Sequence, residues 1–153
     1  MGRKLFEIEP SKLYNSLPQI DFKVTDLKEL KFFRRRLAYT AYEYGALGLA
    51  ANQVGSDLRS FCVLMQHHER NIDTDTYIAS GGDFGAFMKQ LVTIHEKGFS
   101  QYMMFYNPEI IEYSEDLDTI EEGCLSFPGV TLPITRSKSI WATWQDIYGK
   151  PYS

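Results

Sequence analysis

Residues 121–126 read Glu-Glu-Gly-Cys-Leu-Ser, and this stretch decides how the rest of the chain is interpreted. Two carboxylates and a glycine beside a cysteine disfavour an ordinary core strand, because buried charges cost free energy unless the fold uses them. Two interpretations stay open on this stretch alone. The stretch is either a turn that ends at a buried thiol, since free cysteine is among the most buried residue types, or a loop that holds Cys124 for chemistry.

The composition is that of one globular domain spanning residues 1–153. Hydrophobic residues make up 44% and charged residues 24% of the chain, which argues against wholesale disorder. The net charge is −4, and the basic triplet at 34–36 lies inside a helical pattern, so nucleic acid is not the favoured partner. No secretory signal and no run long enough for a membrane span is present, which predicts a cytoplasmic protein without a membrane partner. Two cysteines are too few for a disulfide framework.

A helix of about 18 residues is the clearest local prediction. Asp26 has the character of an N-cap, Glu29 stands where a capping box needs it, and Gly45 is suited to end the helix. Between them, apolar side chains recur along one stripe: Leu30, Phe33, Leu37, Ala41 and Tyr44.

Strands are predicted for most of the remainder. Ile20–Val24 alternates as a short strand, and Ser60–Met65 is an apolar run typical of a central strand, which makes Cys62 a packed thiol. Further strands are expected at 101–106, 110–113, 131–134 and 139–144, with a turn at 127–129 and a hairpin turn at 146–151.

The segment 66–100 is predicted to hold a loop and a second amphipathic helix. This helix contains His95-Glu96, but Phe99 stands where a metal-binding His-Glu-x-x-His motif needs its second histidine. We therefore interpret His95 as a structural or exposed residue.

Small residues dominate Ala46–Gly55, a second unusual stretch. Gly48 would let a backbone or a ligand approach closely, and Gln53 offers both a donor and an acceptor. The alternative is a plain helix-to-strand connection with Gln53 in solvent.

The two stretches, in this order and about seventy residues apart, resemble the motifs of the peptide deformylases. Residues 46–53 are similar to the family's Gly-x-Gly-Leu-Ala-Ala-x-Gln, with Ala46 in place of the first glycine, and residues 122–126 match Glu-Gly-Cys-Leu-Ser in full. The resemblance implies an α+β fold of antiparallel strands packed around helices, with 66–100 as an insertion. It also implies hydrolysis of the N-formyl group of N-formylmethionyl nascent polypeptides, with transient ribosome contact.

The resemblance also assigns roles to individual residues. Cys124 would be one ligand of a divalent metal, Fe²⁺ in the family and replaceable by Ni²⁺, Co²⁺ or Zn²⁺, which activates water and polarises the formyl carbonyl. Catalytic donors would be the Gln53 side-chain amide and the Leu125 backbone N–H. The other implied roles are substrate binding by Leu47, Gly48 and Ile120, and an outer pair, Glu122 with Arg136, that holds the metal-ligand loop.

The family's third motif, His-Glu-x-x-His on a C-terminal helix, has no counterpart in residues 1–153. We expect the sequence to be C-terminally incomplete, without measurable activity of its own and with weak metal retention. The alternatives are a catalytically inactive relative that binds peptides, or a plain scaffold in which Cys124 is only a thiol. A hairpin strand left at an open edge near Trp141–Tyr152 predicts either a monomer or weak self-association.

Overall fold

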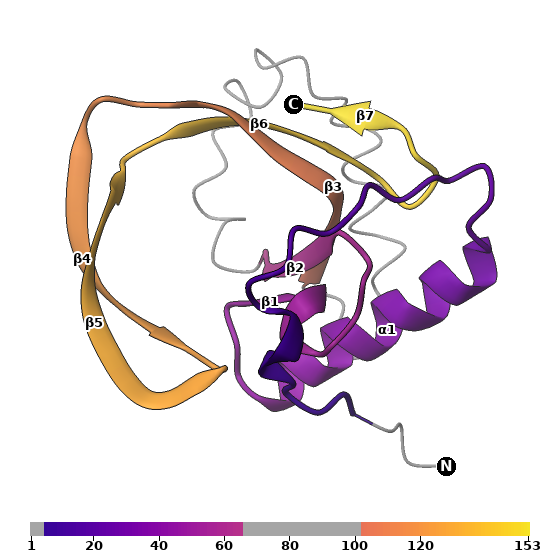
Figure 1. Cartoon of the computed structure of the whole chain (residues 1–153), viewed down its shortest axis with the longest axis horizontal. Helices are drawn as coiled ribbons and strands as arrows, with labels where there is room; N and C mark the ends of the chain where they lie inside the picture. The colour runs from indigo at the N-terminus through magenta and orange to yellow at the C-terminus, as the bar shows by residue number, and fades with distance from the viewer. Residues whose placement is uncertain (1–4, 66–101) are drawn as a thin grey trace.

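The computed structural model describes residues 5–65 and 102–153, which form a five-stranded sheet, a long helix beside it and a separate two-stranded hairpin (Figure 1). All strand pairs are antiparallel, and the larger sheet has the order β1-β2-β3-β6-β7. The α+β class is confirmed for this part of the chain. The elements are η1 (Pro10–Lys12), α1 (Leu27–Glu43), β1 (Gly48–Ala50), η2 (Ala51–Gln53), β2 (Ser60–Leu64), β3 (Tyr102–Tyr113), β4 (Leu117–Cys124), β5 (Phe127–Ser137), β6 (Ile140–Gln145) and β7 (Pro151–Tyr152).

Helix α1 begins where its capping residue predicts. The Asp26 side chain accepts a hydrogen bond of 2.8 Å from the Lys28 backbone N–H, and Gly45 follows the helix with a φ of +63°. The predicted apolar stripe is buried against the sheet except at Tyr44, which is 47% exposed. The prediction for Tyr44 is wrong because the helix ends at Glu43, so Tyr44 leaves the helical path as the C-cap.

Residues 22–24 form a turn, so the strand predicted at 20–24 is wrong. The Asp21 carboxylate accepts a hydrogen bond from the Lys23 N–H at 2.9 Å, and its carbonyl accepts from Val24 and Thr25 at 3.2 and 3.0 Å. Aspartate stabilises turns in this way, and that local interaction outweighs the alternating pattern.

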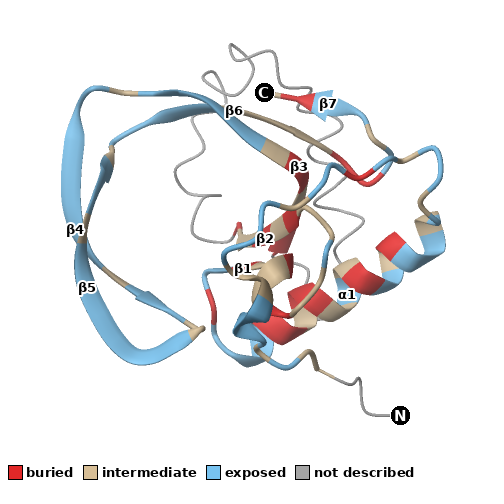
Figure 2. Ribbon diagram, in the orientation of Figure 1, coloured by how far each residue is buried: buried red, intermediate tan, exposed pale blue. Residues whose placement is uncertain are grey.

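Strand β2 is central, as predicted, because it pairs with β1 on one side and β3 on the other. Strand β3 replaces the two strands expected at 101–106 and 110–113. Asn107 adopts a φ of +48° within the strand, and the register against β6 shifts between Tyr106 and Glu109 and again between Ile110 and Glu112. The first half of β3 is buried, whereas the second half leaves the core and is exposed (Figure 2).

The hairpin β4–β5 curves around one side of the molecule, brings its tip back to the main body, and is exposed over nearly its whole length (Figure 2). The turn predicted at 127–129 is wrong, because Phe127 already pairs with Cys124 and the chain reverses at Leu125-Ser126. Strand β5 is also longer than the 131–134 expected. Ile120, in β4, is 55% exposed.

The hairpin turn predicted at 146–151 is confirmed. The Gly149 N–H donates to the Asp146 carbonyl at 3.0 Å, and β7 returns to pair with β6 through Trp144 and Tyr152. The loop and the second amphipathic helix predicted for 66–100, including His95, lie outside the described residues. In the part of the chain that is described, no helix is long and apolar enough to cross a membrane.

Candidate active site

Gln53 joins the two unusual stretches of the sequence. It ends η2, and its backbone carbonyl accepts a hydrogen bond of 2.7 Å from the Glu9 N–H of the N-terminal segment. Its side-chain Nε2 lies 3.5 Å from Cys124 Sγ and 3.2 Å from Ser126 Oγ, across 71 and 73 residues of sequence. The interpretation of Gln53 as a solvent-facing residue in a plain connection is therefore wrong.

The orientation of the Gln53 amide follows from its neighbours. The Ala50 backbone N–H donates to Gln53 Oε1 at 2.9 Å, and a backbone N–H is only ever a donor. The amide oxygen must face Ala50, so the NH₂ group faces the hairpin turn. Two fixed N–H donors thus point toward Cys124 and Ser126.

Cys124 is exposed and Cys62 is buried, so the two thiols have different environments. Burial raises the pKa of the Cys62 thiol to about 12, which keeps it neutral in the core. The interpretation of Cys124 as an ordinary buried thiol is wrong. Leu125, beside it in the turn, is partly buried and packs against the hydrophobic core, which anchors the tip of the hairpin to the main body.

Glu122 and Arg136 form the ion pair that the sequence predicts. Arg136 Nε and Nη2 donate to the two Glu122 carboxylate oxygens at 2.5 and 2.7 Å, a two-point geometry that a lysine could not make. The Arg136 guanidinium lowers the pKa of Glu122, and Glu122 raises that of Arg136. The pair is diagonal in the hairpin, because the register places Glu122 opposite Leu132.

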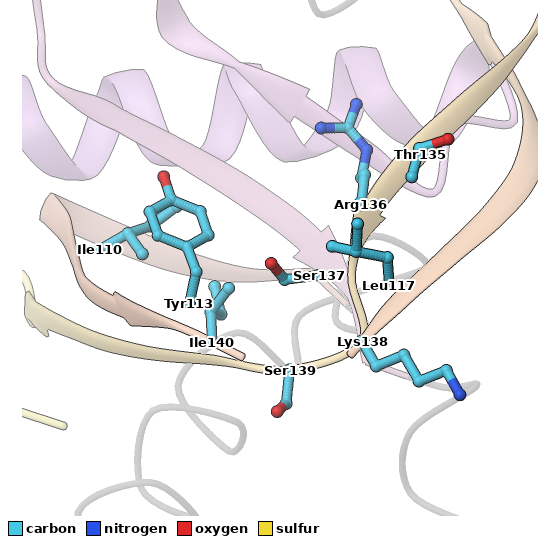
Figure 3. Close-up of a pocket in the computed structure, with 9 residues that line it drawn as sticks. All are labelled: Ile110, Tyr113, Leu117, Thr135, Arg136, Ser137, Lys138, Ser139 and Ile140. Carbon is cyan, nitrogen blue, oxygen red and sulfur yellow. The ribbon is translucent and has the colours of Figure 1, made fainter. Parts of the chain in front are cut away.

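Two hollows lie along the hairpin, with Arg136 lining both. The first, of about 380 Å³, ends at Cys124 and has mostly apolar walls: Glu122, Gly123, Cys124, Phe127, Val130, Leu132, Ile134 and Arg136. The second, of about 530 Å³, lies where β3, β5 and β6 meet, with Ile110, Tyr113, Leu117 and Ile140 among its walls and the Lys138 side chain directed away from them (Figure 3). Only the first hollow contains the cysteine.

The expected substrate-binding residues take different positions. Gly48 lies in β1, at the edge of the larger sheet, and a Cβ there would meet the Cys62 carbonyl oxygen at 3.1 Å. Glycine avoids this tight contact with β2. Leu47 and Ile120 are 69% and 55% exposed, and neither lines the hollow that ends at Cys124.

The described residues do not by themselves form the metal site that the resemblance implies. Across 5–65 and 102–153, no three side chains of His, Cys, Asp or Glu come together to hold a metal ion. Cys124 would supply one thiolate, whereas catalytic zinc-type sites use three protein ligands. The three histidines, at 67, 68 and 95, lie outside the described residues.

Two partners of Gln53 were missed by reasoning from the sequence, namely the Ala50 N–H and the Ser126 hydroxyl. Ser126 closes the matched Glu-Gly-Cys-Leu-Ser motif, so the pattern included it, but local sequence gave it no role. The contact depends on a fold that brings two distant segments together, which no local signal reports.

The sequence is similar to known proteins. The polypeptide deformylase family model matches residues 4–153. A peptide deformylase of Prochlorococcus marinus (strain NATL2A) is 35% identical over 112 residues, which cover 73% of this chain and 42% of that protein. One of Novosphingobium aromaticivorans is 32% identical over 122 residues, covering 80% of this chain and 60% of that protein. The chain therefore spans about half the length of these curated relatives.

Solved structures show the same fold. The Thermotoga maritima peptide deformylase has a TM-score of 0.66 at 25% identity, with 97% of this chain and 78% of that chain covered. A class I type b peptide deformylase from Acinetobacter baumannii with bound Met-Ala-Ser has a TM-score of 0.70 at 16% identity, with 98% and 82% covered. The family match over nearly all of the sequence, together with these folds, shows that the chain belongs to the polypeptide deformylase family.

Proposed function

We propose that the chain forms the substrate-contacting part of a peptide deformylase that acts on N-formylmethionyl peptides in the cytoplasm. The observation that carries this proposal is the contact of the Gln53 amide with Cys124 and Ser126, which unites the two family motifs at one point. Transient contact with the ribosome belongs to the same proposal, because nascent chains would be the source of the substrate.

The reaction needs hydrogen-bond donors that are in place before charge develops on the formyl oxygen. Gln53 meets this requirement, because its oxygen is held by Ala50 and its NH₂ group points to the turn. The Leu125 backbone N–H is the second proposed donor, in a turn anchored by the packed Leu125 side chain. Each such donor typically stabilises a transition state by about 3 kcal/mol.

The substrate backbone would lie along β1. This strand is at the edge of the five-stranded sheet, and extended peptides commonly bind by adding to a sheet edge. Gly48 belongs to this edge, and the exposed Leu47 and Ile120 side chains offer apolar contact for the methionine side chain.

Cleavage requires metal ligands in addition to Cys124. We propose a divalent ion, Fe²⁺ or its substitutes Ni²⁺, Co²⁺ and Zn²⁺, with the further ligands provided from outside the described residues. The competing proposal is a deformylase-like protein that binds formylated peptides without cleaving them. It is favoured by the assembly of only one expected ligand among the described residues.

Binding and cleavage can be tested separately with the peptide N-formyl-Met-Ala-Ser. We expect calorimetry to detect binding by the 153-residue chain, and we expect Gln53→Ala to weaken it about tenfold, within the range of a lost positioned donor. Gln19→Ala, at an exposed glutamine outside the site, is the matched control and should bind as the parent does. Absence of peptide binding by the parent chain would remove the proposal.

Release of formate measures cleavage. We expect none from the 153-residue chain supplied with Ni²⁺, and turnover under these conditions would show that its own residues complete the metal site. Sequencing the transcript beyond codon 153 separates the two proposals. An in-frame His-Glu-x-x-His motif supports the enzyme, and a stop codon directly after Ser153 supports the binding protein.

A further inference from the structure

We propose that Ser126 is a positioning residue that holds the Gln53 amide in the orientation needed to contact the substrate carbonyl. The inference rests on the proposed function and adds to it a residue that acts through Gln53 and does not itself contact the reacting atoms. Ser126 Oγ lies 3.2 Å from Gln53 Nε2 and is the nearer of the two acceptors beyond that nitrogen.

The arrangement around the amide divides its three hydrogen-bonding groups among different partners. Oε1 is occupied by the Ala50 N–H, one N–H is directed to Ser126 Oγ, and the other is directed to Cys124 Sγ at 3.5 Å. Hydroxyl oxygens accept hydrogen bonds more strongly than sulfur does. The proton toward Ser126 is therefore retained, and the proton toward Cys124 is the one available to a carbonyl oxygen.

The Ala50 contact alone does not fix the amide plane. A single acceptor contact at Oε1 leaves rotation about the terminal torsion, which is broad for glutamine. The Ser126 contact on the opposite side of the amide supplies the second point of attachment. Ser126 also follows Leu125 in the turn. The turn would therefore fix the position of the Gln53 amide relative to the Leu125 backbone N–H, the other proposed donor.

The first test reads the Gln53 side chain in the ligand-free protein. In ¹H–¹⁵N spectra, we expect Ser126→Ala to shift the two Gln53 side-chain NH₂ resonances toward each other and to speed their exchange with water. Ser126→Thr keeps the hydroxyl and should restore both. Ser139→Ala, at the far end of the hairpin before β6, is the control and should leave them unchanged. Unchanged Gln53 resonances in Ser126→Ala would overturn the proposal.

The second test is a double-mutant cycle on binding of N-formyl-Met-Ala-Ser. We expect Ser126→Ala to weaken binding about fivefold, the equivalent of one neutral hydrogen bond. In the Gln53→Ala background, the same change should have no further effect, because its target is gone. Ser126→Thr should bind within about twofold of the parent on the same scale.

The outcomes separate this inference from the proposed function. Equal and additive losses from Ser126→Ala in both backgrounds would show that Ser126 acts independently of Gln53, which overturns the inference alone. If Gln53→Ala itself leaves peptide binding unchanged, the proposed function is contradicted, because the Gln53 amide would not contact the substrate. The spectra of the ligand-free protein then still decide whether Ser126 orients the amide.

Discussion

Replacement of Asn107 by alanine is the most informative perturbation of the fold, because this residue connects three segments. It is 6% exposed, and its Oδ1 accepts from the Ile20 N–H at 2.7 Å. Its Nδ2 donates to the Ile20 carbonyl at 2.9 Å and to Gln145 Oε1 at 2.7 Å. The side chain thereby ties the N-terminal segment and β6 to the point where β3 leaves the core.

The expected cost of Asn107→Ala can be worked out from these contacts. Three neutral hydrogen bonds at about 1 kcal/mol each account for about 3 kcal/mol. The φ of +48° adds about 1 kcal/mol, because alanine is disfavoured in the left-handed region that asparagine tolerates. The sum of about 4 kcal/mol is a large part of the 5–15 kcal/mol by which domains are usually stable.

Urea unfolding followed by tryptophan fluorescence measures this loss. With a typical slope of 1–2 kcal/mol per molar urea for a small domain, the midpoint should fall by roughly 2 to 4 M, or the variant should be unfolded in buffer. Asn107→Gly should be less destabilising than Asn107→Ala, because glycine adopts positive φ freely. Asn15→Ala, at an exposed loop position, is the control and should stay within about 0.5 kcal/mol of the parent. A loss below about 1 kcal/mol for Asn107→Ala would refute the reasoning, since one hydrogen bond alone costs that much.

Three further results are expected. In native protein at pH 8, a thiol reagent should label Cys124 only, because burial raises the pKa of Cys62 to about 12; labelling of two thiols before unfolding would contradict this. The pKa of Glu122 is lowered in the fold, so its ion pair with Arg136 stabilises the protein above the ordinary glutamate pKa of about 4.3, and this stability is lost as the pH falls further. Glu122→Gln should therefore make the melting temperature fall less steeply at acid pH. An unchanged acid dependence would count against the pair. The exposed apolar face of the hairpin should make the chain associate with itself at high concentration. Leu132→Glu should therefore reduce light scattering more than Thr131→Glu, which lies on the opposite face. Equal effects of the two variants would argue for a different contact.

The elements that local chemistry determines were predictable from the sequence. The Asp26 cap and the apolar stripe place α1 to within a residue or two, and the hairpin turn before β7 follows from its turn-forming residues. The errors occur where one polar side chain overrides a pattern. Asp21 bends an alternating segment into a turn, and Asn107 carries β3 through a position that reads as a break.

The site was predictable only through the two motifs taken together. Nothing local in 46–53 indicates that Gln53 meets Cys124, because that contact depends on the packing of β1, η2 and the hairpin tip. Local pattern also gave no role to Ser126. The Glu122–Arg136 pair was easier, since opposite charges on two strands of one hairpin are within reach of each other.

The hairpin that carries Cys124 depends on contacts with the rest of the protein to hold its position. Two-stranded hairpins are marginal alone, and β4 and β5 pair only with each other in the described part of the chain. The tip is held by Leu125 in the core and by the Gln53 contacts. Gln53 is thus both a proposed donor and part of the anchor, so its removal should increase amide exchange at the tip as well as weaken peptide binding. Loss of binding without faster exchange would assign Gln53 to substrate contact alone, whereas both changes together would show that the anchor and the donor are the same group.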